Sequence, residues 1–113
     1  MNAPWHGQLA PIDTDVALAI AQAEFGVSRD ELVSHRRCDT LVRARAFAVW
    51  VLRSLGVPMS YPRIGRAIGG RDHTTIINLH LKAVTLRLTD PAFRGACQRI
   101  EERFSAMGEA CHA

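Results

Sequence analysis

Several signals of common protein classes are missing from this sequence of 113 residues. Cysteine occurs only three times, an odd number, and no two cysteines have Cys-x-x-Cys spacing, so neither a disulfide framework nor a zinc site is expected. No apolar run approaches the roughly 20 residues that span a bilayer, and no secretory signal opens the chain. These absences favour a reduced cytoplasmic protein that binds neither a metal nor a membrane.

Signals of catalysis are missing as well. The sequence has no Gly-x-x-x-x-Gly-Lys-[Ser/Thr] loop for a nucleotide and leaves no room for an ATPase module. No nucleophile is accompanied by a base and an orienting group. We therefore expect no enzymatic activity and no cofactor.

Strand-like alternation of apolar and polar residues is also absent, and helical spacing takes its place. Capping and stop signals predict helices over about 13–25, 29–33, 39–55, 61–68, 72–88 and 91–107. The expected fold is all-α, a helix-turn-helix bundle of about five to six helices. We expect residues 1–12 to form a flexible N-terminal arm, residues 13–107 to form the helix-turn-helix domain and residues 108–113 to form a C-terminal tail.

Positive charge is concentrated in the middle of the chain. Residues 29–87 hold eleven Arg and Lys but only four Asp and Glu, whereas the flanking residues are net acidic. His35-Arg36-Arg37 in this region is expected to form a basic loop. A polyanion-binding surface requires such a concentration, although an ordinary solvated basic face has it too.

The most specific string is Gly69-Gly70-Arg71-Asp72-His73-Thr74-Thr75. Its two glycines break one helical pattern, and Asp72 starts another, as in the turn of a helix-turn-helix motif. A helical wheel of residues 74–88 gives one polar edge: Thr74, Thr75, Asn78, Lys82 and Thr85. The apolar residues flank or lie behind that edge: Ile77, Leu81, Val84, Leu88, Ile76, Leu79 and Ala83. We therefore expect a helix buried over most of its circumference. Its narrow polar edge has a composition that suits base reading and differs from the Glu and Lys mixture typical of an ordinary solvated face.

The same string, preceded by Val42-Arg43-Ala44-Arg45-Ala46 and Ser60-Tyr61-Pro62-Arg63-Ile64-Gly65, resembles the C-terminal DNA-binding domain of the bacterial replication initiator DnaA. The resemblance covers roughly residues 14–107. It implies sequence-specific binding of double-stranded DNA at boxes similar to TTATCCACA, with regulation of replication initiation or transcription as the outcome. It also implies a nucleoid-associated protein that has other replication or transcription proteins as further partners.

The resemblance assigns roles to individual residues. The residues expected to contact bases in the major groove are Asp72, His73, Thr74, Thr75 and, on the same edge, Asn78. Arg45 is expected to enter an A·T-rich minor groove. The residues expected to contact the DNA backbone are Arg43, Pro62, Arg63, Arg66, Arg71 and Lys82.

Each assignment has a simpler alternative. Asp72 is also a suitable helix cap, His73 a packed surface histidine and Arg45 a surface charge. The sequence departs from the family pattern at Asn78, where a histidine is common, and at Leu81, where a basic residue is usual. The alternative functions are a protein–protein adaptor on the same scaffold and a nonspecific DNA binder.

Overall fold

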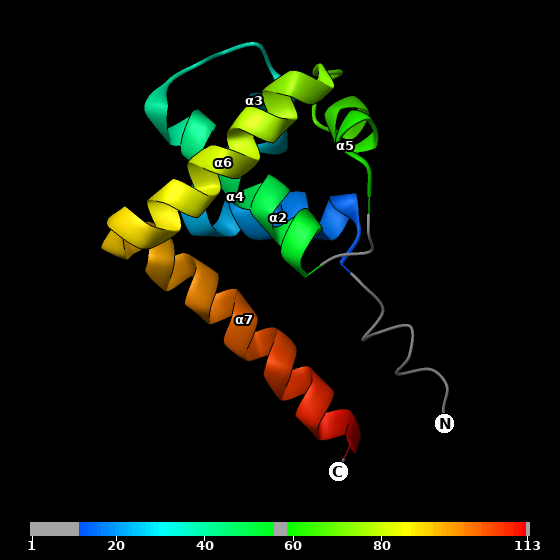
Figure 1. The fold of residues 1–113 in the computed structure, drawn as a ribbon, viewed down its shortest axis with the longest axis vertical. Helices are drawn as coiled ribbons and strands as arrows, with labels where there is room; N and C mark the ends of the chain where they lie inside the picture. The colour runs from blue at the N-terminus through cyan, green and yellow to red at the C-terminus, as the bar shows by residue number, and fades with distance from the viewer. Residues whose placement is uncertain (1–11, 56–58, 113) are drawn as a thin grey trace.

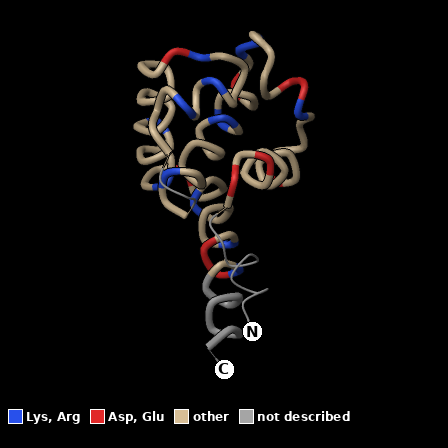
Figure 2. The backbone as a smooth tube through the Cα atoms, turned by 90° about the vertical axis from the view of Figure 1, so that its right-hand side faces the viewer, with Lys and Arg blue, Asp and Glu red and all other residues tan. Residues whose placement is uncertain are grey.

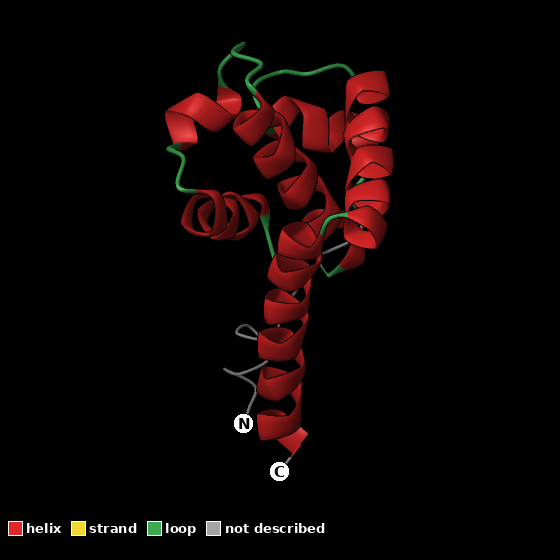
Figure 3. Cartoon of the chain, turned by 90° about the vertical axis from the view of Figure 1, so that its left-hand side faces the viewer, coloured by secondary structure: helices red, strands yellow, loops and turns green. Residues whose placement is uncertain are grey.

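The computed structural model describes residues 12–55 and 59–112. Every regular element in these ranges is a helix (Figure 1, Figure 3). The six helices are α2 (Thr14–Phe25), α3 (Arg29–Val33), α4 (Asp39–Ser54), α5 (Tyr61–Ala67), α6 (His73–Thr89) and α7 (Pro91–His112). The predicted all-α fold is confirmed. None of the described helices combines the length and the apolarity needed to cross a bilayer.

Helix α4 forms the centre of the core. An unbroken run from Ala44 to Leu52 is buried, because α2 covers one side of the helix and α6 the other. The ring of Phe47 lies 5.4 Å from that of Phe25 and 5.8 Å from that of Phe93, which joins α2, α4 and α7. This apolar centre packs against one side of α6, and the opposite side of α6 faces solvent.

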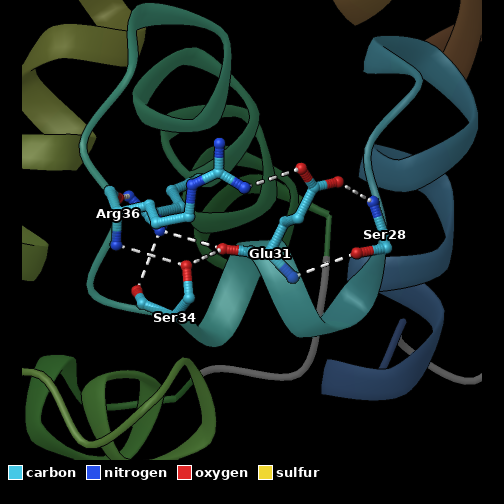
Figure 4. A network of polar contacts seen from close by, with 5 residues as sticks. Ser28, Glu31, Ser34 and Arg36 are labelled. Carbon is cyan, nitrogen blue, oxygen red and sulfur yellow. Dashed lines mark hydrogen bonds and ion pairs between the residues drawn. The ribbon is translucent and has the colours of Figure 1, made fainter.

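Local capping signals explain where the first helices begin and end. The Asp13 carboxylate accepts a hydrogen bond from the Val16 amide at 2.9 Å, and Gly26 ends α2 in the left-handed conformation with φ of 65°. Ser28 and Glu31 form the predicted capping box of α3, which Figure 4 shows from close by. The predicted bounds of these helices are therefore confirmed to within a residue.

The ends of the chain differ from the prediction. Ile12 falls in the predicted flexible arm, yet it is buried against the core, while the rest of the arm lies outside the described residues. Helix α7 continues to His112, past the predicted end at residue 107, and extends away from the bundle in Figure 1. Nothing in the sequence after residue 107 breaks a helix before His112, since Gly108 alone only weakens one.

Helices α5 and α6 are joined by a polar contact that depends on pH. The Tyr61 hydroxyl lies 2.9 Å from Nδ1 of His80, and the Arg53 guanidinium lies over the Tyr61 ring. Partial burial, and then the charge of Arg53, lower the pKa of His80 from its usual 6.5. The folded state therefore binds the proton less readily than the unfolded state, so this histidine destabilises the fold as pH falls below about 6.5.

We expect the melting temperature to drop between pH 7.5 and pH 5, and the drop to be smaller in His80→Gln. Glutamine keeps an acceptor for Tyr61 but does not titrate. Thermal melts of both proteins followed by circular dichroism at the two pH values measure the difference. An equal drop in both would assign the pH dependence to other groups.

Candidate nucleic-acid interface

Helices α5 and α6 and the turn between them form a helix-turn-helix. Gly69 and Gly70 have φ of 79° and 70°, a left-handed conformation that glycine adopts without strain. The Arg71 amide donates to the Gly65 carbonyl at 2.8 Å, so the chain folds back on α5 before α6 starts. A Cβ atom on Gly65 would overlap the Arg71 carbonyl oxygen. The turn therefore requires small residues where the two helices meet.

The tip of α6 is solvent-exposed and polar. Asp72 is the N-cap, and its Oδ2 accepts a hydrogen bond from the Thr74 amide at 3.0 Å. That bond is the main reason why the pKa of Asp72 lies below its usual value. The other carboxylate oxygen, Oδ1, lies 3.5 Å from Nδ1 of His73, and both side chains are more than half exposed. The capping alternative for Asp72 is thus confirmed, and the cap leaves Oδ1 accessible to a ligand.

The polar edge of α6 is oriented as the helical wheel predicts. Thr74, Asn78 and Lys82 are exposed and Thr75 is half-buried. On the opposite side, Ile76, Leu79 and Ala83 are buried against the core. The edge is therefore a rigidly supported row of donors, acceptors and methyl groups.

The predicted burial is wrong for three of the four residues of the adjoining apolar stripe, while the fourth, Ile77, is half-buried. Leu81, Val84 and Leu88 keep 60%, 45% and 73% of their surface exposed. Helix α6 packs on α4, α5 and α7 from one side only, so a second apolar stripe next to the polar edge stays uncovered. We call these three residues the outer stripe.

Helix α5, which packs against α6, also carries exposed basic residues. Pro62, Arg63 and Arg66 are exposed. Neither arginine forms an ion pair within the described ranges. The two arginines line an open depression of about 460 Å³ together with Asp13, Thr14, Met59 and Ala67. Their guanidinium groups are thus available to an anion.

Arg45 does not lie where a groove-reading arginine must lie. Its exposed fraction is 3%. Its guanidinium donates to four backbone carbonyls, those of Leu32, Arg36, Glu31 and Ser34, at 2.6–3.0 Å. Four of the five guanidinium donors are thereby used. The expected insertion of Arg45 into a minor groove is contradicted, and so is the alternative of a surface charge.

Two further arginines are engaged with the protein itself. Arg43 forms an ion pair with Asp90, which lies at the end of α6 opposite to the tip, about 25 Å away along the helix. Arg71 is half-buried and donates to the carbonyls of Ile68 and Ser34. These bonds use one of the five guanidinium donors of Arg43 and two of those of Arg71, so part of each group is already engaged with the protein.

The basic loop His35-Arg36-Arg37 lies next to the tip of α6, although the predicted site does not include it. All three side chains are exposed. His35 and Arg37 line a depression of about 340 Å³ that Thr75 and Arg71 also line. Besides burial, the charge of Arg37 lowers the pKa of Arg71. The basic run is visible in the sequence, but its position beside Thr75 depends on tertiary contacts. Figure 2 marks the Lys and Arg positions along the backbone.

The comparisons with known proteins point to one family. Residues 15–82 match the model of the bacterial DnaA protein helix-turn-helix. The chromosomal replication initiator protein DnaA of Rhizobium meliloti (strain 1021) is 44% identical over 98 residues, which are 87% of this chain and 16% of that protein. The DnaA protein of Nitrosomonas europaea is 43% identical over 61 residues, 54% of this chain and 13% of the relative. The chain thus spans about a sixth or less of these relatives. Because the family model covers more than half of the chain and includes its helix-turn-helix, the chain belongs to the bacterial DnaA helix-turn-helix family.

Proposed function

We propose that this protein binds double-stranded DNA in a sequence-specific manner at boxes similar to TTATCCACA, and so regulates replication initiation or transcription. The observation that carries the proposal is the polar edge of α6, which starts at an exposed helix N-terminus and rests on buried residues. A helix presented in this way fits the major groove with its first turns toward the bases. Membership of the DnaA helix-turn-helix family supports the same function.

The base-reading roles follow from the chemistry of the edge. The free oxygen of Asp72 suits a cytosine amine, and the methyl groups of Thr74 and Thr75 suit a thymine methyl. Asn78 offers the donor and acceptor pair that matches adenine. His73 offers a ring nitrogen at the same tip.

The backbone contacts come from the exposed cations around that edge. Pro62, Arg63 and Arg66 are exposed on α5, which packs against α6, and Lys82 lies on the polar edge itself. We assign the remaining arginine contacts to Arg36 and Arg37 of the basic loop, because both are exposed. Arg36 also pairs with Glu31 at 3.4 Å. Arg43, Arg45 and Arg71 are half-buried or buried. Such contacts give affinity and orientation without reading sequence.

The direct test is a fluorescence-anisotropy titration with a labelled duplex that contains TTATCCACA and with a scrambled duplex of the same composition. The proposal expects the box to bind at least about a hundredfold more tightly at moderate salt, as specific binding exceeds nonspecific binding by large factors. Equal binding of both duplexes at every salt concentration would identify a nonspecific binder.

Binding is also expected to weaken with salt, with a log–log slope of about −0.9 for each neutralised phosphate. Lys82→Ala should weaken both duplexes alike and flatten the slope by about 0.9. Arg103→Ala is the matched control, because Arg103 is an exposed cation on α7 outside the proposed interface. If both variants changed the slope equally, net charge and not a local contact would account for the effect.

The second candidate function is a protein–protein adaptor, and the outer stripe is the observation that favours it. Exposed apolar side chains in one row mark many protein contacts. The double variant Leu81→Gln, Leu88→Gln separates the two functions. A DNA-reading protein shows a box preference in the wild type and keeps it in this variant, whereas an adaptor shows no preference in either protein.

A further inference from the structure

Two arginines from different elements converge on the loop after α3. Arg45 comes from α4, and Arg71 comes from the turn before α6. The Ser34 carbonyl accepts a hydrogen bond from Nη2 of each, at 2.9 Å from Arg45. A single backbone oxygen therefore ties the core helix and the helix-turn-helix to the same loop.

The rest of the loop is held by the same groups. Arg45 also binds the carbonyl of Arg36, and the Ser34 hydroxyl donates to the Glu31 carbonyl at 2.7 Å and accepts from the Arg36 amide at 3.2 Å. Figure 4 shows this network around Ser34. Carbonyls at the end of a helix need donors, and here guanidinium groups supply them.

The arrangement brings two positive charges together at the loop. Arg45 is almost fully buried, and none of the partners described for its guanidinium is a carboxylate. Arg71 brings a second positive charge close to it, and repulsion between the two charges opposes their burial. An apolar residue in place of either arginine would avoid the repulsion but would leave carbonyls of the loop without donors, so both charges are retained where they hold the loop.

The contacts of the two arginines bear on the position of the basic loop. Arg37 lies three residues after the shared Ser34 carbonyl and lines the same depression as Thr75 on the polar edge of α6. The turn between α5 and α6 also lies close to the end of α3, because a Cβ atom on Gly69 would overlap the Val33 carbonyl oxygen. The distance from Arg37 to the polar edge is thus set by the contacts of Arg45 and Arg71.

We propose that Arg45 and Arg71 are positioning residues that hold the loop of residues 34–37 in register with the polar edge of α6, so that one DNA site is read by both together. The inference rests on the proposed function. It makes the two arginines necessary for sequence preference although neither touches DNA.

The test uses Arg71→Lys, which keeps the charge but replaces a planar fork of donors by a single ammonium group. The expected result is a loss of at least tenfold in the preference for the box over the scrambled duplex, with nonspecific affinity unchanged. An arginine that only contacted a phosphate would be replaced by lysine with little loss. Retention of the full preference in Arg71→Lys overturns the proposal.

A double-mutant cycle identifies the route of the effect. If Arg71 acts through the loop, Arg37→Ala weakens box binding much less in Arg71→Met than in the wild type. Lys82→Ala is the control and should weaken binding equally in both backgrounds, because Lys82 is not held by the loop. Additive effects of Arg37→Ala and Arg71→Met would show independent contacts and overturn the proposal.

A measurement without DNA separates this proposal from the proposed function. The backbone amide of Arg36, which donates to the Ser34 hydroxyl, should exchange with solvent at least tenfold faster in Arg71→Lys than in the wild type. If the wild type showed no box preference, the proposed function would fail, and the exchange rates alone would decide whether the two arginines hold the loop. Unchanged exchange overturns the holding role in either case.

Discussion

Gly69→Ala is expected to lower the free energy of unfolding by about 2–5 kcal/mol, the sum of two effects. Gly69 has φ of 79°, where an alanine costs about 1–2 kcal/mol. The new Cβ atom would also overlap the Val33 carbonyl oxygen, and a backbone atom cannot move aside without shifting α3. Overpacking of this kind costs about 1–3 kcal/mol more. Urea denaturation followed by circular dichroism measures the change.

Gly70→Ala is the matched control for this prediction. Gly70 has nearly the same backbone conformation, with φ of 70°, but a Cβ atom there would meet nothing within 4 Å. Its variant should lose only the conformational part, about 1–2 kcal/mol. If the two variants were equally stable, the close approach between the turn and α3 would have no energetic role.

The helices themselves could be predicted because their signals are local. Asp13, Ser28, Ser60 and Asp72 each cap the helix that follows, and the structure places a capping hydrogen bond at all four. Such a bond joins residues two or three apart, so the sequence alone carries the information. For the same reason, the order of residues along the chain is enough to locate the helix-turn-helix and its exposed tip.

The outer stripe could not be predicted from periodicity. A helical wheel shows which residues share a face, but not how many neighbours the helix has. Leu81, Val84 and Leu88 would be core residues in a helix covered from two sides. Because α6 packs on the bundle from one side only, its buried face is the narrower one around Ile76, Leu79 and Ala83.

The position of Arg45 could not be predicted for a related reason. An arginine near the start of an apolar helix is expected to project into solvent. Its carbonyl partners lie 9–14 residues earlier in the chain, and they come together only when α3 and its loop pack on α4. The arginine of the matching string is thus buried, while Arg36 and Arg37 of the preceding loop are exposed.

Asp72→Asn is expected to lower the sequence preference while leaving the fold intact. Asparagine is as good an N-cap as aspartate, so the bond to the Thr74 amide remains and the melting temperature should change little. The amide group, however, places a donor where a carboxylate oxygen would accept from a cytosine amine. Loss of that base contact costs about 1–3 kcal/mol, or roughly 5- to 150-fold in the ratio of box to scrambled affinity.

Asp72→Ala supplies the comparison that assigns the effect. Alanine removes both the cap and the base contact, so this variant should lose about 0.5–2 kcal/mol of stability in addition to its preference. Removal of a negative charge from a basic surface should meanwhile strengthen binding to the scrambled duplex in both variants at low salt. The measurement is a pair of titrations for each variant together with a thermal melt. An Asp72→Asn protein that kept the full box preference would limit Asp72 to its role as a helix cap, because the asparagine alters only the chemistry presented to the base.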